Sequence, residues 1–355
     1  MSTTDTEKVL EEARKNKIDG IITIASDRPM TTVAKVVKEL NLIGINESTA
    51  INATNKSKMR DILKKNNVPI PMYFSVYNYD CYIKAINKIR ENNYRCIVKP
   101  ADNSGSRGIR LIDNYDSDNL RRIYDYCMQN SISGNLVVEE YMEGPEVSVE
   151  TISKNGICNV IQVTDKLTTG APYFVEMGHS QPSQLGHLIV EKIKKVAIEA
   201  NRAIGIIDGP SHTEIKITKN GPKIVEIGAR LGGDNITTHL VPYSTGVNMV
   251  EACIRLSIGE DINLEKNLNL AAAIRYIEYN KGKIKFIHGL NEAKSMSGIK
   301  DVTLVSNVNE NLNEIKCSGD RAGFVISQAS NPKDAISIAE RAIRTIKFEF
   351  FSEER

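Results

Sequence analysis

The sequence predicts a mixed α/β (α+β) fold. Segments with the periodicity of amphipathic helices alternate along the chain with short runs of β-branched and apolar residues. This alternation is the pattern of helices layered on sheets. A chain of 355 residues with 41% hydrophobic content is long and apolar enough for about two or three packed domains.

The composition argues against several classes of partner. A net charge of +2 gives no strong attraction to nucleic acid or to a membrane surface, and the absence of Trp disfavours base stacking. No apolar stretch approaches the roughly 20 residues of a spanning helix, and the polar N-terminus is unlike a signal peptide. The six cysteines lie far apart without a Cys-x-x-Cys pair, which is typical of reduced thiols. We therefore expect a cytoplasmic protein that binds neither nucleic acid nor membranes.

The first 66 residues have too few strands to close a doubly wound sheet unless an upstream segment or a partner completes it. Their pattern predicts helices at 5–17, at 30–40 and within 48–66, and short strands at 20–24 and 43–45. The run Val68-Pro69-Ile70-Pro71 blocks helix continuation and marks a boundary.

The rest of the chain divides into three further segments. Residues 67–143 contain a compact α+β pattern, with helices from Cys81 and at 118–129 and strands at 95–99, 109–112 and 136–139. Residues 144–258 contain antiparallel strands at 147–152, 160–164, 212–218 and 223–227, with a helix at 186–203. Residues 259–355 contain strands near 271–276 and 322–326 and a closing amphipathic helix at 333–346.

A hairpin with two carboxylates is the first candidate site. Glu214 and Glu226 each lie among apolar residues, on strands that flank the turn signal Asn220-Gly221. A three-residue loop at 219–221, with Gly221 in a left-handed bulge, sets Glu214 opposite Glu226. A two-residue Asn-Gly loop would put them on opposite faces. Paired acids on a mostly buried strand need a positive partner, so the hairpin is a candidate divalent-cation site, the alternative being two surface carboxylates. The core-facing side is expected to hold Ile215, Ile217, Val225 and Ile227.

A second candidate is the loop after Lys99. This lysine ends a buried strand, and small residues at 104–108 follow it before the next strand. Small residues allow backbone N–H groups to approach phosphate oxygens, and Lys99 and Arg107 add positive charge. The loop is neither a Walker A loop nor a dinucleotide fingerprint. A plain glycine-rich hairpin is the alternative.

In this order, the motifs resemble the ATP-grasp superfamily of carboxylate–amine and carboxylate–thiol ligases, over roughly residues 48–350. Residues 55–60 resemble the family's phosphate-contacting helix, and residues 137–144 resemble the hinge whose backbone holds adenine. His-Thr-Glu-Ile-Lys followed by Glu-x-x-x-Arg-x-Gly-Gly is similar to the L-amino-acid ligase and carnosine-synthase type. The tail around residues 274–276 and 320–326 is similar to the C-terminal part of biotin-carboxylase-like members.

The resemblance implies a Mg-ATP site, with Mn²⁺ as a substitute for Mg²⁺. It implies nucleotide contacts from Lys56, Lys99, Ser104, Gly105, Ser106, Arg107, Gly108, Glu139, Glu140, Tyr141, Met142 and Glu146. It further implies that Glu214 and Glu226 bind magnesium and that Arg230 steadies the acyl phosphate or the substrate. His179, in an irregular stretch at 173–182, is a further candidate catalytic residue, either binding a substrate carboxylate or deprotonating the amine. A structural histidine is the alternative.

Weaker candidates surround these residues. Lys166 either touches phosphate or is a solvated lysine, and His212 shares the strand face of Glu214. Asp234, Asn235 and His239 either line the acceptor side or have core or capping roles.

The implied architecture is an ATP-grasp fold with an incomplete Rossmann-like domain at 1–66 and a small mobile lid at 67–143. A larger antiparallel-sheet domain at 144–258 carries the Mg-ATP site, with a C-terminal part at 259–355 packed on it. Two departures from the family stand out. Gly228 replaces an asparagine that binds metal in many members, and roughly the first two β-α units are missing. A natural short form, a wrongly assigned start and a truncation are all open.

The implied activity is ATP-dependent ligation of a small carboxylate to an amine. An acyl phosphate would form, an amide or peptide bond would follow, and ADP and phosphate would be released. Two alternatives stay open: a biotin-carboxylase-like or other carboxylate-activating ligase, and a nucleotide-binding subunit that needs a partner for activity. The partners expected are the small-molecule carboxylate and amine, and a homodimer is compatible with the sequence.

Overall fold

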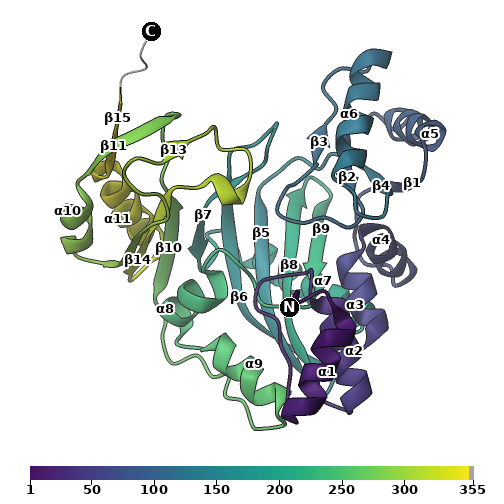
Figure 1. Ribbon diagram of the computed structural model, residues 1–355, viewed down its shortest axis with the longest axis horizontal. Coiled ribbons are helices and arrows are strands. Elements are labelled where there is room, and N and C mark those ends of the chain that lie inside the picture. Colours follow the sequence, from purple (N-terminus) through teal and green to yellow (C-terminus); the bar gives the residue numbers. More distant parts are fainter. Residues whose placement is uncertain (352–355) are drawn as a thin grey trace.

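Antiparallel sheets organise residues 1–351, the part of the chain that the computed structural model describes (Figure 1). A four-stranded sheet has the order β1 (Tyr73–Val76), β4 (Leu136–Glu140), β2 (Cys96–Pro100) and β3 (Arg110–Leu111). An eight-stranded sheet has the order β12 (Ile299–Leu304), β14 (Gly323–Ala329), β10 (Ala271–Tyr276), β7 (Glu176–Gln181), β6 (Ile157–Thr168), β5 (Glu146–Lys154), β8 (Gly209–Thr218) and β9 (Gly221–Gly228). A three-stranded sheet has the order β13 (Asn311–Leu312), β11 (Gly282–His288) and β15 (Lys347–Phe350). The predicted mixed α/β class is confirmed.

The N-terminal part is helical. It consists of α1 (Thr6–Asn16), α2 (Met30–Leu40), α3 (Glu47–Thr54) and α4 (Lys56–Lys65). Asn46 and Asn55 cap α3 and α4 by accepting hydrogen bonds from the backbone N–H groups of the first turn. The strands predicted at 20–24 and 43–45 are wrong, because neither segment is paired with another strand. Local β propensity does not make a strand without a neighbour to exchange hydrogen bonds.

The four-stranded sheet carries helices α5 (Tyr79–Arg90) and α6 (Ser117–Gln129). Its core joins apolar residues of both helices to the inward positions of β2 and β4, including Val98 and Val138. Figure 1 shows this unit at the upper right, standing over the end of the large sheet near β8 and β9. The sequence predicted its helices and three of its strands, and missed β1, whose residues are mostly half-buried.

Helices pack on the eight-stranded sheet in two apolar clusters. Helix α7 (His187–Ile204) packs on it through Ile193 and Ala197, together with residues of α3 and α4. A second apolar cluster lies under α8 (Val241–Thr245), α9 (Met249–Ser257) and a π-helical turn at Ile236–Leu240. Strand β7 was predicted as an irregular stretch. It was missed because its buried residues, such as His179 and Gln181, are polar and show no apolar alternation.

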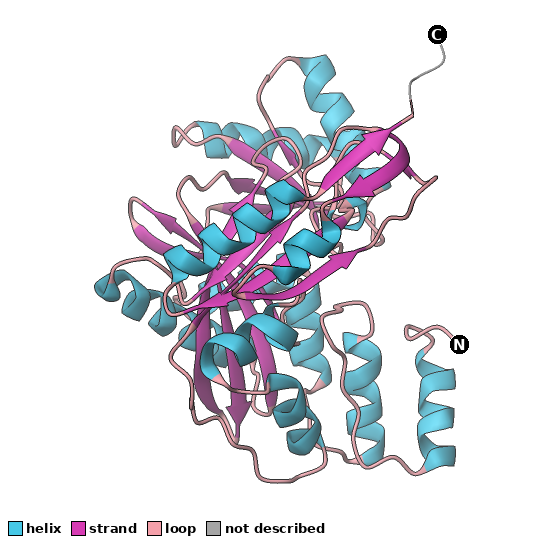
Figure 2. Cartoon of the chain, turned by 90° about the vertical axis from the view of Figure 1, so that its left-hand side faces the viewer, coloured by secondary structure: helices cyan, strands magenta, loops and turns pink. Residues whose placement is uncertain are grey.

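The C-terminal strands β10, β14 and β12 extend the same large sheet beyond β7. Helices α10 (Leu290–Ser295) and α11 (Pro332–Thr345) cover them, and α11 contributes Ala335, Ala339 and Ala342 to that core. Figure 2, viewed from this side, shows helices crossing in front of the strands. No helix within residues 1–351 is long and apolar enough to span a membrane. The domain boundaries at 66, 143 and 258 stay predictions.

Candidate active site

A cavity of about 380 Å³ lies between the four-stranded unit, the large sheet and the loop at residues 25–28. The predicted nucleotide-binding, metal-binding and catalytic residues all line it, except Gly108. Gly108 lies behind the loop, where a Cβ atom would approach Asn130 and Pro100 within 2.5 and 2.7 Å. The cavity therefore brings together residues from Lys56 to Arg230, although it does not by itself assign their roles.

The carboxylate hairpin is formed by β8 and β9, and Glu214 pairs with Glu226 across it. The loop that connects the two strands differs from the predicted loop. Thr218 pairs with Gly221, so the loop is shorter than the three residues expected. A bulge at Val225 then shifts the register between the Ile215–Ile224 pair and the Glu214–Glu226 pair.

The bulge also changes which side chains face the core. Ile224, rather than Val225, is fully buried beside Ile215 and Ile227. Val225 lines the cavity instead. The two-residue loop alone would put Glu226 on the opposite face from Glu214. The extra residue at the bulge puts both carboxylates on the same face.

Lys166 on β6 lies among three carboxylates of the large sheet. Its Nζ is 2.6 Å from Glu214 Oε1, 2.8 Å from Glu146 Oε1 and 3.5 Å from Glu176 Oε1. The side chain is only 3% exposed, so the alternative of a solvated lysine is wrong. Burial would lower the pKa of Lys166, but the three carboxylates hold it well above its usual value.

The same contacts act on Glu214. Burial would raise its pKa, but Lys166 and His212 overcome this effect and hold the pKa well below the usual range. Lys56 approaches the other acid of the hairpin, with Nζ 3.2 Å from Glu226 Oε1 and 2.6 Å from the carbonyl oxygen of Asn103. Each hairpin acid therefore has an ammonium group beside it.

The donor set of the hairpin fits magnesium. Glu214 and Glu226 offer hard oxygen ligands that face one cavity. Within residues 1–351, no group of three or more His, Cys, Asp or Glu side chains is arranged to hold a metal ion. Magnesium suits such a site, because it is commonly bound through one or two carboxylates together with phosphate oxygens and water.

His212 supports this hairpin from inside the sheet. Its Nδ1 is 2.7 Å from Oε1 of the fully buried Glu150, and its Nε2 is 3.4 Å from Glu214 Oε1. Burial would lower the pKa of His212, but Glu150 raises it to about 9. Gly232 crosses above the pair, where a Cβ atom would be 2.7 Å from both side chains.

Lys99, which lies in the predicted lid at residues 67–143, is paired with a buried carboxylate. Lys99 Nζ is 2.9 Å from Glu139 Oε2, and Arg60 Nε donates to Glu139 Oε1 at 2.6 Å. Burial would raise the pKa of Glu139, but Arg60 and Lys99 lower it to about 2. Because this carboxylate is only 1% exposed, a nucleotide can meet Glu139 only through its backbone.

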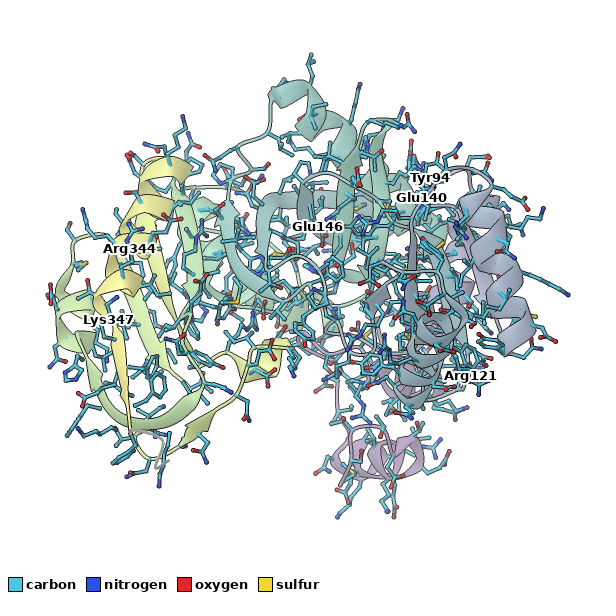
Figure 3. All side chains as sticks on the ribbon, turned by 90° about the horizontal axis from the view of Figure 1, so that it is seen from above. Tyr94, Arg121, Glu140, Glu146, Arg344 and Lys347 are labelled. Atoms are coloured by element: carbon cyan, nitrogen blue, oxygen red, sulfur yellow. The ribbon has the colours of Figure 1, made fainter. Side chains whose placement is uncertain are left out.

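The neighbouring hinge acids also have internal partners. Glu140 accepts hydrogen bonds from Lys223 Nζ at 2.6 Å and from the N–H group of Met72 at 2.9 Å. Glu146 is 3.0 Å from Lys216 Nζ, in addition to its contact with Lys166. Figure 3 shows Glu146 near the middle of the molecule and Glu140 closer to the lid. Tyr141 and Met142 lie between these acids in the chain and line the cavity.

The loop at 104–108 turns tightly over the cavity. Gly105, Ser106 and Gly108 have φ angles of 65°, 59° and 77°, which turn successive backbone groups toward one side. Ser106 Oγ donates to the carbonyl oxygen of Phe174 at 3.3 Å. The loop thereby contacts the segment between β6 and β7, on the opposite wall of the cavity.

Arg230 is held by a residue that the sequence analysis missed. Its Nε and Nη2 donate to the two carboxylate oxygens of Asp27 at 2.8 and 3.1 Å. A Cβ atom at Gly228 would lie 3.2 Å from both Arg230 and Asp27, so the family's asparagine would crowd this ion pair. Asp27 lies 203 positions away in the chain, and no local signal marks it.

His179 lies beneath another ion pair. Its Nε2 is 3.2 Å from Asp234 Oδ2, and Arg321 donates to both oxygens of Asp234 at 2.8 and 2.7 Å. Burial would raise the pKa of Asp234, but Arg321 and His179 hold it far below its usual value. Of the three weaker acceptor-side candidates, Asp234 lines the cavity, whereas Asn235 and His239 do not.

Known proteins are similar to this chain in sequence and in fold. The ATP-grasp domain model matches residues 92–238, and the model of L-amino acid ligase C-terminal domain 2 matches residues 275–350. The crystal structure of an L-amino acid ligase from Bacillus licheniformis is similar with a TM-score of 0.84 and 24% identity, over 98% of this chain and 86% of that one.

Two curated relatives are similar in sequence. The uncharacterized protein y4rH of Sinorhizobium fredii is 28% identical over 92% of this chain and 67% of its own length. Alanine--anticapsin ligase of Bacillus subtilis is 27% identical over 74% of this chain and 59% of its own length.

The matched domain and the similar fold show that the chain contains an ATP-grasp domain, which confirms the resemblance seen in the sequence. Residues 92–238 match an ATP-grasp domain, and residues 275–350 match the C-terminal domain 2 of the L-amino acid ligases.

Proposed function

We propose that this chain is an ATP-dependent carboxylate–amine ligase that joins an amino acid or similar small acid to an amine. The reaction would pass through an acyl phosphate and release ADP and phosphate. The observation that carries the proposal is the cross-strand pair of Glu214 and Glu226, which faces the same cavity as Lys56, Lys99 and Arg230.

ATP is proposed to bind between the lid and the large sheet. Ile97, Met142 and Phe174 line the cavity beside the hinge and supply apolar surface for the adenine ring. The hinge backbone would hold the base edge, and Glu146 the ribose hydroxyls. Lys56, Lys99 and the backbone of residues 104–108 would hold the phosphates.

Glu214 and Glu226 would hold Mg²⁺. Bound there, Mg²⁺ would neutralise the β- and γ-phosphate oxygens during phosphoryl transfer. Lys166 supports this assignment, because its ammonium group lies 2.6 Å from Glu214 and keeps that carboxylate ionised.

The chemistry proposed is two successive transfers. A carboxylate oxygen of the acid attacks the γ-phosphorus of ATP, and ADP leaves, which produces the acyl phosphate. The amine then attacks the acyl carbon, phosphate leaves, and the amine nitrogen loses a proton. Arg230 would stabilise the charge on the acyl phosphate, and Asp27 keeps its guanidinium aimed into the cavity.

His179 is the proposed base for the amine proton. Asp234 is a poor base, because its pKa is held far below its usual value. If Nε2 of His179 donates to Asp234, the other ring nitrogen is left as a hydrogen-bond acceptor. That nitrogen, Nδ1, is buried and has no hydrogen-bond partner within residues 1–351. A carboxylate that fixes a histidine tautomer is the arrangement a general base requires.

The experiment is ADP release from purified protein with Mg-ATP and a panel of amino acids and amines. Wild type is compared with Glu226→Ala and with Glu265→Ala, a control at an exposed acid away from the cavity. We expect release that depends on particular substrate pairs, persists in the control and is lost in Glu226→Ala. If ATP binds but no acid supports turnover, a nucleotide-binding subunit that needs a partner replaces this proposal.

A further inference from the structure

Arg60 on α4 is the largest fully buried side chain among residues 1–351. A buried guanidinium is costly unless its donors are satisfied. Nε donates to Glu139 Oε1 at 2.6 Å, and Nη2 donates to the carbonyl oxygen of Val225 at 2.7 Å. Neither partner lies on its own helix. Glu139 belongs to β4 of the lid, and Val225 belongs to β9 of the large sheet.

Val225 is the bulged residue of the carboxylate hairpin. Ile224 pairs with Ile215 and Glu226 pairs with Glu214, so Val225 has no partner residue across the ladder. A bulge leaves backbone groups unpaired, and these need other partners when they are buried. Arg60 supplies one for the Val225 carbonyl. Without the extra residue, Glu226 would point to the opposite face from Glu214.

The other end of Arg60 reaches the lid lysine. Glu139 bridges Arg60 and Lys99, with Lys99 Nζ 2.9 Å from its second oxygen. Arg60 does not itself line the cavity, whereas Lys99 and Glu226 both do. One buried guanidinium thus connects a cation on one wall of the cavity to a carboxylate on the other.

We propose that Arg60 is a positioning residue, which holds the Val225 bulge and thereby keeps Glu226 in register to bind the metal. Through Glu139, the same side chain sets the place of Lys99 relative to that metal. The inference rests on the proposed Mg-ATP function, and it assigns to Arg60 no contact with the substrate or nucleotide.

Arg60→Lys is the decisive variant. Lysine keeps a positive charge beside Glu139, so the buried carboxylate stays compensated. Its single nitrogen lacks the planar fork that serves Glu139 and Val225 together. Arg60→Met removes both contacts, while Lys99 still pairs with Glu139. Lys65→Met, at an exposed lysine of the same helix, is the matched control.

The measurement is Mn²⁺ binding followed by electron paramagnetic resonance, with and without the nucleotide analogue AMP-PNP, beside thermal unfolding and ADP release. We expect both Arg60 variants to bind Mn²⁺ roughly tenfold to a hundredfold more weakly than wild type, which is typical when a group that orients a metal ligand is lost. Arg60→Lys should do so with a melting temperature close to that of wild type. Lys65→Met should match wild type in every measurement.

Two outcomes overturn the inference in different ways. If Arg60→Lys binds Mn²⁺ within about twofold of wild type, Arg60 is only structural, whatever its melting temperature, and the proposed ligase function stands. If wild type binds no Mn²⁺ with AMP-PNP and turns over no ATP, the proposed function fails and the inference fails with it. Should Arg60→Met not fold, Arg60→Lys alone decides.

Discussion

Replacing Glu139 by glutamine should destabilise the lid by an amount that depends on pH. This carboxylate lies 2.6 Å from Arg60 Nε and 2.9 Å from Lys99 Nζ, and it is only 1% exposed. Breaking a buried ion pair by neutralising one partner costs about 3–5 kcal/mol. We expect Glu139→Gln to lose about that much free energy of unfolding at pH 7.

The pKa of Glu139 sets how this loss changes with pH. Burial opposes ionisation, but Arg60 and Lys99 lower the pKa to about 2 from an ordinary 4.5. Because the folded pKa is below the unfolded one, the contribution is present above pH 4.5 and is lost as the pH falls toward 2. The contribution of Glu139 ionisation to the free energy of unfolding is roughly 3 kcal/mol in all. About 1.4 kcal/mol of it should be lost between pH 7 and pH 3.5.

The assay is urea unfolding followed by far-UV circular dichroism, with refolding checked at each pH. Other carboxylates also titrate in this range, so the informative quantity is the difference between wild type and Glu139→Gln. That difference should narrow as the pH falls from 7 to 3.5. Asp125→Asn, which removes an exposed carboxylate paired with Arg121, should stay within about 0.5 kcal/mol of wild type at pH 7. A difference that stays constant over this range would refute the reasoning.

Three further substitutions, the first with Gly156→Ala as its control, give three more predictions. Gly144→Ala should cost well over 1 kcal/mol in thermal unfolding, because at φ 128° its Cβ would lie 2.0 Å from a backbone oxygen. Gly156→Ala, with φ 76° and no atom within 4 Å of its Cβ, should cost only about 1 kcal/mol. Equal losses of stability in the two alanine variants would contradict this prediction. Lys166→Met leaves buried carboxylates without their cation, so Mg²⁺ should raise its melting temperature more than that of wild type. Gly228→Ala should reduce the rate of ADP release by crowding Arg230, while AMP-PNP binding measured by calorimetry stays unchanged.

The carboxylate hairpin shows what the sequence can and cannot predict. The pairing of Glu214 with Glu226 was predicted correctly, because two acids among apolar residues around a turn favour a shared face. The loop length was wrong, and the error was compensated by a bulge at Val225. A β-branched residue fits either face of a strand, so nothing in the sequence marks Val225 as the extra one. What locates it is its contact with Arg60, 165 positions earlier in the chain.

Most other errors have the same origin. The run Ile21-Ile22-Thr23-Ile24 has high β propensity but no neighbouring strand, whereas β7 is a buried strand of the large sheet despite its polar composition. Asp27 lines the cavity near one end of the chain, and Arg321, near the other end, binds the cavity residue Asp234. Local sequence patterns reveal motifs whose residues are all close together in the chain, such as the loop after Lys99. They do not reveal partners that tertiary packing brings to a motif.

Four candidate cations of the cavity are each paired with a carboxylate from a different element of the fold. Lys99 pairs with Glu139, and the other pairs are Lys56–Glu226, Lys166–Glu214 and Arg230–Asp27. These contacts hold the lid, the hairpin and the N-terminal loop around one cavity. A bound triphosphate would compete with these carboxylates for the same cations. Under the proposed function, magnesium would balance the carboxylates that lose a cation, so that a site with so many acids would hold an anionic nucleotide.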